Sequence, residues 1–567
     1  MSTETVWFLS AEIVLVATAL AIYLGGAFSR SVRPWALVAG AGIVLAAAAL
    51  WAWGGTPPRV PDPVVANHPP PTAAASGLAG IHNATENCPV IPDPLAAFGR
   101  WLALAAGAVM VLMTARPLTT GGTPEYLGSL LLAVAGLMLV AAAGNLILLF
   151  VGLELISIPT YILLSLGRRD AAGQESAAKY FFLSVLASAI FLYGLSFLYG
   201  ASGTTQLWAI RLRLSMPAGS PLGLPAGFQP LVKLGLVLVM AGLAFRITAV
   251  PFHFYAPDVY QGTIQANAAL LSVLPKAAGL VALVRLVVFA MPDVAFDAWK
   301  IAVVLSALTM TLGNVVALWQ GHLRRLLAYS AIAHAGYLLM GLAVGLAGPG
   351  VSGWWDGLAA MWFYLCVYAA ATLGAFAALV YLGHGRQQIE AIEELAGLGR
   401  SQPAVAAALA VCLLSLTGLP PTAGFLGKLF LVGSALGVEA GTGGPHRPWL
   451  VGLAVLAVLN AAIAACYYLR IVAVMYFRTP PAMPRPAGGA GAWTATMACC
   501  LAVLVLGVCP GPLVRACSSA GQRPVSSLWR EDMKMVESQW GFANCGEDRT
   551  TCLPLPPREG RGEGKPR

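Results

Sequence analysis

Charged residues are scarce in this sequence. Only 10% of its 567 residues are Asp, Glu, Lys or Arg, whereas 58% are hydrophobic. A soluble protein usually has about a quarter of its residues charged, so this composition excludes an ordinary soluble protein. The formal charge of +9 does not indicate nucleic-acid binding, because the basic residues stand singly in short connections between apolar segments. That distribution is typical of membrane-topology signals.

Close cysteine pairs are also lacking, since none of the ten cysteines forms a CxxC motif. Cys88, Cys545 and Cys552 lie outside the apolar segments, where a disulfide could form but no spacing supports one. The others in apolar segments are typical of small hydrophobic residues; they are Cys366, Cys412, Cys466, Cys499, Cys500 and Cys509. The pattern favours neither an iron–sulfur cluster nor a metal site.

Apolar stretches of about 20 residues, the length that crosses a bilayer core as a helix, recur from Val6 to Leu513. The alternating pattern of membrane strands is absent. The first stretch, Val6 to Gly26, has no cleavage signal and indicates a retained helix. The sequence therefore predicts an all-α integral membrane protein with about fourteen transmembrane helices. The expected segments are 5–27, 34–54, 94–115, 124–143, 145–166, 176–200, 231–254, 267–290, 299–320, 325–346, 355–383, 403–437, 448–477 and 493–513.

Two regions lack membrane character. Residues 55–93 are rich in Pro, Ala and Asn and indicate a flexible loop, and residues 514–567 indicate a disordered tail. Basic residues favour one set of loops, which we expect to be cytoplasmic, so both termini should face the periplasm or exterior. The richer set carries Arg30, Arg33, Arg116, Arg168, Arg169, Arg324, Arg325, Arg386, Arg400 and Arg478, and the poorer set Arg59, Arg211, Arg213 and Arg447.

An internal repeat organises the chain. AAKYFFLSVLASA, from Ala177, resembles AAMWFYLCVYAAA, from Ala359, at an offset of 182 (359 − 177 = 182). The same offset relates Arg246 to Lys428, and prolines stand near both. Copies five helices apart have opposite orientations, the inverted-repeat pattern of transporters. The alternative is that apolar helices resemble one another by chance.

The repeat predicts a division of the chain. Residues 1–115 hold three N-terminal helices, 124–290 a first repeat and 299–477 a second. The last transmembrane helix follows at 493–513.

Four charged residues stand well inside apolar segments: Glu154, Arg246, Lys276 and Lys428. A charge at the bilayer centre costs at least about 2.5 kcal/mol. A set of structural ion pairs is the alternative, but one acid cannot pair three bases. Burial disfavours a charged lysine and a nearby carboxylate favours it, so moving the carboxylate would load and unload a proton. The sequence therefore predicts a proton pathway.

Secondary candidates accompany these charges. His253 follows Arg246 by seven residues, and His334 lies with Tyr329 in an otherwise apolar segment. Histidine titrates near neutrality and can shuttle protons, although a histidine at a helix end, such as His322, is often only interfacial. Glu175 and Lys179 form either an ordinary i,i+4 pair or a secondary contact to Glu154.

Several strings resemble the antiporter-like subunits of complex I, the NADH–quinone oxidoreductase, and most closely subunit N. They are VGLELISIPTYILLSLG, ESAAKYFFLSVLASAIFLYG, GLAFRITAVPFHFYAPDVYQG, LSVLPKAAGLVALVR, HLRRLLAYSAIAHAGYLLMG and LPPTAGFLGKLFLV, within roughly residues 94–480. The resemblance implies a fourteen-helix fold with two inverted five-helix repeats, beside other membrane-arm subunits. It also implies no cofactor in this chain, because NADH oxidation, FMN, the iron–sulfur clusters and most of the quinone site belong to partner subunits.

The resemblance places the family's functional acid on Glu154 and its central lysines on Lys276 and Lys428, and it also matches Lys179 and His253. The family usually has lysine at position 246. Arginine does not deprotonate in proteins, so we expect Arg246 to be a fixed charge. Two alternatives remain open: a subunit of a sodium/proton antiporter, and a membrane scaffold that does not pump.

Overall fold

Helices make up nearly all of the structure, a computed structural model that describes residues 3–28, 32–54, 89–115, 122–215, 224, 227–291, 295–348, 355–383, 388–438, 446–479 and 488–522. Among these residues the only strand-like pairing consists of isolated bridges, such as Val90 with Ala143. The predicted all-α fold is confirmed. The predicted loop at 55–88, the tail beyond residue 522, and Cys88, Cys545 and Cys552 lie outside the described residues.

The first half of the chain forms α1 (Thr3–Phe8), α2 (Ser10–Phe28), α3 (Val32–Gly54), α5 (Pro94–Met113), α6 (Thr123–Ala142), α7 (Leu146–Gly167), α8 (Ala171–Ser202), α9 (Leu207–Ser215), α10 (Gln229–Ile247), α11 (Ala256–Gly262), α12 (Gln265–Leu283) and the π-helix η1 (Val284–Ala290). The second half forms α13 (Ala295–Ala317), α14 (Leu323–Ala347), α15 (Gly357–Leu382), the short 3-10 helix η2 (Ile392–Leu395), α16 (Leu398–Ser401), α17 (Pro403–Thr417), α18 (Ala423–Leu436), α19 (Arg447–Phe477), α20 (Gly489–Val508) and α21 (Gly511–Gly521).

Thirteen helices of the described chain are long and apolar enough to cross a bilayer. The shorter α17 and α18, of 15 and 14 residues, together make one more crossing that is interrupted in the middle. The prediction of about fourteen transmembrane helices is therefore confirmed. The narrow break expected at Gly144 and Asn145 is also present, because Asn145 caps α7 by accepting a hydrogen bond of 2.7 Å from the Leu148 amide.

Each of the two predicted repeats contains one interrupted helix. In the first, α10 ends at Thr248, whose φ of 64° is left-handed, and in the second α17 ends at Gly418, with φ of 90°. These breaks lie 170 positions apart (418 − 248 = 170), and a proline follows each by three residues.

The offset of 170 corrects one sequence expectation. Arg246 lies just before the first break, in the last turn of α10, whereas Lys428 lies ten residues after Gly418 (428 − 418 = 10), in α18. The two are therefore not equivalent positions of the repeat. The offset of 182 holds for the α8 and α15 strings only, because the connections between each of these helices and the next broken helix differ in length.

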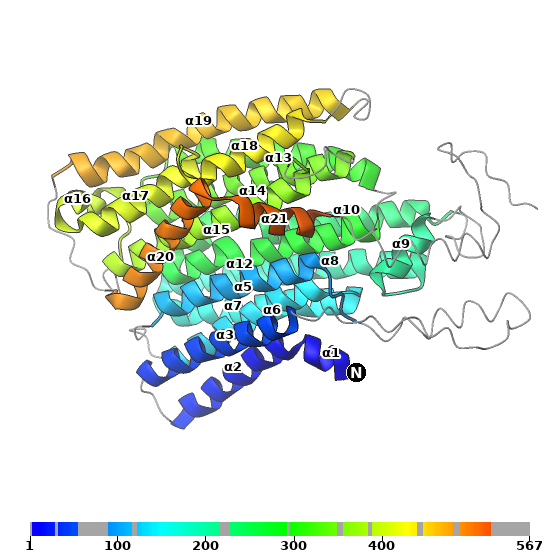
Figure 1. Cartoon of the computed structure of the whole chain (residues 1–567), viewed down its shortest axis with the longest axis horizontal. Helices are drawn as coiled ribbons and strands as arrows, with labels where there is room; N and C mark the ends of the chain where they lie inside the picture. Colours follow the sequence, from blue (N-terminus) through cyan, green and yellow to red (C-terminus); the bar gives the residue numbers. More distant parts are fainter. Residues whose placement is uncertain are drawn as a thin grey trace, which may run out of the picture. The chain divides into compact units, whose positions relative to one another are not determined.

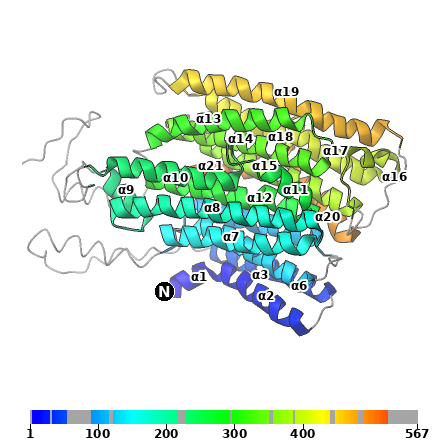
Figure 2. The same ribbon diagram turned by 180° about the vertical axis from the view of Figure 1, so that it is seen from behind.

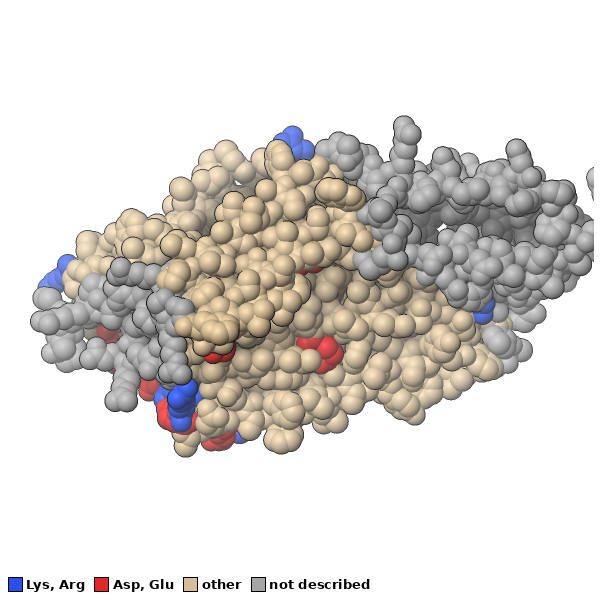
Figure 3. Space-filling model, turned by 90° about the horizontal axis from the view of Figure 1, so that it is seen from below, with Lys and Arg blue, Asp and Glu red and all other residues tan. Residues whose placement is uncertain are grey.

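The helices lie side by side, with α12, α14 and α15 in the interior and α2, α3 and α19 at opposite edges (Figures 1 and 2). Every residue of α12 is buried. The edge helices instead expose large apolar side chains, such as Leu24, Leu45 and Leu459. Figure 3 shows a face with few charged atoms: acidic and basic atoms gather at its lower left, an acidic patch lies near its centre, and single basic groups lie at other margins. Such a surface suits lipid or apolar partner helices.

The chain after α20 differs from the expectation of a tail that is disordered from residue 514. The described residues continue as α21, which contacts α15 and α5 and buries Cys517 and Ala520. Its amphipathic sequence, GPLVRACSSAG, gives the helix one apolar face to bury. The prediction of a disordered tail rested on composition, which does not reveal a short amphipathic helix.

Candidate proton pathway

Glu154 and Arg246 form an ion pair between α7 and α10, with 2.7 Å between Arg246 Nη2 and Glu154 Oε1. The arginine side chain is 4% exposed and the glutamate 23%. Arg246 also donates to the hydroxyl of Ser188 (2.9 Å) and, through Nη1, to Ser157 (2.5 Å) and the Leu153 carbonyl (3.1 Å). The Ser188 hydroxyl in turn donates to Glu154 Oε1 (2.6 Å). The guanidinium is thus held by four acceptors in a fixed geometry.

The site lies where local structure favours a cation. Arg246 occupies the last turn of α10, next to carbonyls that have no partner within the helix and carry partial negative charge. Arg246 also packs closely against α12. A Cβ added at Gly279 of that helix would stand 3.4 Å from the Cβ of Arg246. Arg246 therefore joins the Glu154 site on α7 to the helix that carries Lys276.

Lys276 is fully buried in the middle of α12 and lacks a carboxylate partner among the described residues. Its Nζ donates to the Ala331 carbonyl of α14 and lies 5.6 Å from the centre of the Tyr368 ring. Tyr368 donates from its hydroxyl to the Ser272 carbonyl, one turn before the lysine (3.1 Å). A helix carbonyl and an aromatic face are weak counter-charges, so the positive charge of this lysine is only partly compensated.

His334 lies between the two buried lysines. Its Nδ1 is 2.6 Å from the Tyr364 hydroxyl and its Nε2 is 3.1 Å from the Tyr468 hydroxyl. Its ring centre lies 5.0 Å from that of Tyr368, which contacts Lys276, and 6.1 Å from that of Tyr337. Since imidazole can donate at one nitrogen and accept at the other, this histidine can pass a proton between two hydroxyls.

Lys428 lies at the second helix break. Its Nζ donates to the carbonyls of Leu416 (3.0 Å) and Thr417 (2.7 Å), which end α17, and sits 4.8 Å from the centre of the Tyr337 ring. These carbonyls are free because α17 stops there, and the negative end of the helix dipole points at the ammonium group. The break thus provides a site for a cation without a carboxylate.

Gly418 makes room for this lysine. Its φ is 90°, and an added Cβ would lie 2.8 Å from the Lys428 Cδ. Gly418→Ala is therefore expected to displace the Lys428 side chain and to add backbone strain of about 1–2 kcal/mol. If Lys428 carries protons, we expect proton transport to fall several-fold, while Gly452→Ala, at a position with open space around it, leaves transport unchanged. Equal pumping by both variants in membrane vesicles would contradict the placement of Lys428.

A charged hollow of about 320 Å³ opens where α8 and α11 meet the segment 388–394. It is lined by Arg168, Ala172, Glu175, Ser176, Lys179, Asp258, Gln261, Gly262, His322 and Glu390. Lys179 pairs here with Glu175 (2.6 Å) and Asp258 (3.3 Å). Burial, followed by the charge of Arg324, lowers the pKa of His322, so this histidine is neutral at pH 7.

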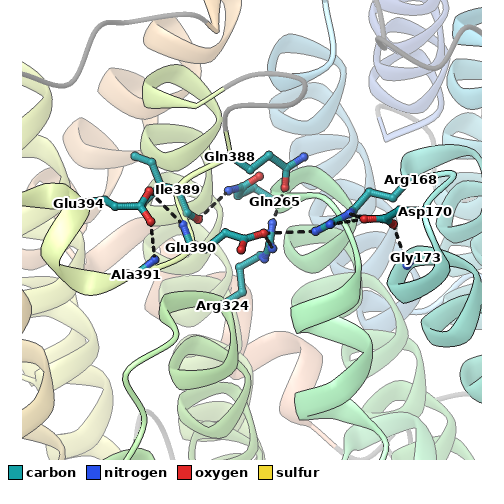
Figure 4. A network of polar contacts seen from close by, with 10 residues as sticks. All are labelled: Arg168, Asp170, Gly173, Gln265, Arg324, Gln388, Ile389, Glu390, Ala391 and Glu394. Carbon is teal, nitrogen blue, oxygen red and sulfur yellow. Dashed lines mark hydrogen bonds and ion pairs between the residues drawn. The ribbon is translucent and has the colours of Figure 1, made fainter. Parts of the chain in front are cut away.

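An ion network beside the hollow ties the two repeats together (Figure 4). Arg168, after α7, pairs with Asp170 and, at 3.3 Å, with Glu390 of the segment 388–394. Arg324 of α14 meets the same Glu390 oxygen at 2.8 Å. The hydrogen bond from Arg168 holds the pKa of Asp170 below its usual value, so Asp170 stays ionised well into the acidic range.

Comparison with known proteins identifies the family. The model described as "NADH:quinone oxidoreductase/Mrp antiporter, TM" matches residues 143–443. NADH-quinone oxidoreductase subunit N of Rhizorhabdus wittichii is 41% identical over 439 residues, which cover 76% of this chain and 85% of that protein. Subunit N 2 of Rhizobium meliloti is 41% identical over 367 residues, 65% of this chain and 71% of its own length. The chain belongs to the subunit N family.

Solved structures share the fold of this chain. A chain of respiratory complex I from Thermus thermophilus with bound Aureothin is 31% identical, with a TM-score of 0.68 over 90% of this chain and 99% of that one. A chain of the Mrp complex from Dietzia sp. DQ12-45-1b has a TM-score of 0.70 over 92% of this chain and 97% of that one. At 20% identity, the second likeness shows the fold alone.

The structure of this subunit N family member brings most of the sequence-predicted residues into two groups. Glu154 and Arg246 form one, and Lys276, His334 and Lys428 lie in a second, connected by tyrosine side chains.

The secondary candidates lie elsewhere. Glu175 and Lys179 belong to the hollow, where Asp258, not Glu154, is the further partner of Lys179. His253 lies in the break between α10 and α11, and its Nδ1 has no hydrogen-bond partner among the described residues. Tyr329 packs against the hydrophobic core.

Sequence reasoning missed the residues that connect these charges. Ser157 and Ser188 hold Arg246, and Tyr368, Tyr364 and Tyr468 surround His334. Isolated serines and tyrosines in apolar helices look like ordinary core residues, so no local pattern distinguishes them. Two further ion pairs, Arg100–Glu12 and Arg285–Asp93, could have been suspected from the sequence. Each arginine falls within a predicted membrane segment, where a charge needs a partner.

Proposed function

We propose that this chain is a proton-translocating subunit of the membrane arm of a respiratory NADH–quinone oxidoreductase. The observation that carries the proposal is the placement of two buried lysines, without carboxylate partners in the described chain, on either side of His334. A structural role alone would favour paired charges, because an unpaired buried charge costs stability. Membership of the subunit N family supports the same function.

In this proposal Arg246 is a fixed charge and does not carry the proton. It is the counter-ion of Glu154 and acts electrostatically on Lys276 of the neighbouring helix, while water and nearby groups carry the proton flux past it. Lys276 then exchanges its proton through His334 with Lys428. Electron transfer in partner subunits changes the charge near Glu154, and each lysine responds by binding or releasing a proton.

The chain itself is proposed to bind no redox cofactor. NADH, FMN, the iron–sulfur clusters and quinone belong to other subunits of the assembled complex, and the partners of this chain are the other membrane-arm subunits and the lipid bilayer. The described residues contain no cluster of three or more His, Cys, Asp or Glu side chains that could hold a metal.

We further propose the cell (inner) membrane of a bacterium as its location, with the N-terminus toward the periplasm. The charged hollow carries Arg168 and lies beside Arg324 and Arg325, which belong to the basic loops. The positive-inside rule makes this end cytoplasmic. Lys276 would then exchange protons with the cytoplasmic side through the end of α12 nearest the hollow.

Purification of the native assembly tests this function against its rivals. The chain should copurify with NADH–quinone oxidoreductase subunits, and NADH oxidation by the assembly should acidify the interior of inverted membrane vesicles. Copurification with sodium/proton antiporter subunits, without NADH oxidation, would favour the antiporter instead. Normal pumping by an assembly that lacks both Lys276 and Lys428 would favour a scaffold.

A further inference from the structure

A second buried ion pair closes the end of α12 that lies away from the hollow. Arg285, in the π-helix η1, is fully buried and binds Asp93 with both arms of its guanidinium, at 2.8 Å from Nη1 to Oδ2 and 2.7 Å from Nη2 to Oδ1. Its Nε also donates to the Ala141 carbonyl of α6 (3.2 Å). One side chain thus joins η1, the end of α6 and the start of α5.

The chain around Asp93 is fixed in place as well. Asp93 caps α5 by accepting a hydrogen bond of 2.8 Å from the Ala96 amide. The preceding residues pair with the turn between α6 and α7, through bonds of 2.8 Å from the Ile91 amide to the Ala142 carbonyl and from the Gly144 amide to the Pro89 carbonyl. These backbone hydrogen bonds fix Asp93 beside the end of the helix that carries Lys276.

The two ends of α12 differ sharply around Lys276. Toward the hollow, its Ser272 hydroxyl is 3.1 Å from the Tyr260 hydroxyl of α11, next to the hollow-lining Gln261. Toward η1, the residues from Ala277 to Val284 are all apolar or glycine, and all are buried. Within α12 and η1 the first charged residue in that direction is Arg285, although Arg246 of α10 packs beside Gly279. Along α12 a proton leaving Lys276 thus meets a hydroxyl group toward the hollow, whereas the described residues of this helix toward η1 offer none.

We propose that Arg285, anchored by Asp93, is an electrostatic seal that blocks proton leakage from Lys276 toward the η1 end. Arginine keeps its proton and cannot relay one, and a fixed positive charge repels a hydronium ion, as arginines do in proton-excluding pores. Both Asp93 oxygens accept hydrogen bonds from Arg285, so the guanidinium is held in a fixed position. The inference rests on the proposed proton pathway through Lys276.

Passive proton leak through the assembled complex tests the seal without any electron transfer. Proteoliposomes that hold the complex would receive an imposed pH gradient and no NADH, and a pH-sensitive dye would report the influx. Arg285→Gln, which keeps polar contacts, and Arg285→Leu should each raise the leak about tenfold. That factor corresponds to Coulomb repulsion between unit charges roughly 13 Å apart, the span of nine helical residues, at an effective dielectric constant of about 20.

Three control variants distinguish an electrostatic seal from an ion pair that only stabilises the packing. Asp93→Asn loosens the same contact but leaves the positive charge, so its leak should not rise above the native level. Arg100→Leu breaks the other fully buried pair, with Glu12, whose side chains are 1% and 3% exposed, and should not leak either. Adding Lys276→Leu to Arg285→Gln should abolish the extra leak, because the leak passes through that lysine.

Each outcome of this experiment decides the question. Leak in both Arg285 variants that depends on Lys276 supports the seal. Equal leak in Asp93→Asn, or leak that persists without Lys276, overturns it and leaves a packing role. A proton leak at the native level in the Arg285→Gln complex also overturns the seal. If NADH-driven pumping still requires Lys276 in that complex, the proposed function stands.

Discussion

Replacing Arg246 by alanine should abolish most NADH-driven proton pumping, whereas Arg246→Lys should retain it. Alanine leaves the Glu154 carboxylate, 23% exposed, without its counter-ion and without the guanidinium that Ser157 and Ser188 hold. Breaking a buried pair in this way typically costs about 3–5 kcal/mol, and less for a carboxylate that is partly exposed. A loss of only about 1.4 kcal/mol in the rate-limiting state lowers the rate tenfold, so we expect at least that decrease.

The Arg246→Lys variant is the matched control for this prediction. Its ammonium group would restore the positive charge beside Glu154 with fewer hydrogen bonds, so turnover should stay within a few-fold of the native rate. Pumping would be measured in inverted membrane vesicles, with the amount of assembled complex determined in each preparation. Unchanged pumping in Arg246→Ala, at normal assembly, would show that the fixed charge is unnecessary.

Lys428→Leu should have an effect of similar size for a different reason. Its ammonium group rests on the carbonyl end of α17, a site that no other side chain in the described residues fills. Leucine has a similar volume but no proton to exchange, so the path from His334 would end at Tyr337. We expect turnover coupled to pumping to fall by about tenfold or more, with assembly retained.

An exposed lysine provides the comparison for Lys428→Leu. Lys300 lies on the surface of α13, where replacement by leucine removes a positive charge without touching the tyrosine and histidine cluster. Lys300→Leu should pump at the native rate. Normal pumping by Lys428→Leu would instead support a scaffold that holds the membrane arm together.

The sequence predicts the charged residues well because of the bilayer. Glu154, Lys276 and Lys428 stand out in apolar segments. Burying a charge there costs free energy, so such a residue is retained only for function or for pairing. The number of crossings follows from hydropathy for the same reason. The contacts between helices do not follow, because Ser188 and Tyr368 acquire their meaning only from residues far away in the chain, Glu154 and Lys276.

The repeat shows where pattern matching fails. The AAKYFF and AAMWFY strings share one offset, but the helix breaks at Thr248 and Gly418 share another, because connections of different length separate them. Arg246 therefore lies in the half-helix before its break, whereas Lys428 lies in the half-helix after its break. Each instead neighbours the carbonyl end of a half-helix, a likeness of environment that a single sequence offset cannot express.

The number of protons moved per NADH oxidised by the reconstituted complex, with and without Lys276→Leu, tests the central claim most directly. Lys276 is fully buried and connects the hydroxyls near the hollow with the His334 cluster. The account predicts that Lys276→Leu lowers this ratio or halts turnover, while the complex still assembles. A ratio and a rate equal to those of the native complex would contradict a proton pathway through these buried charges.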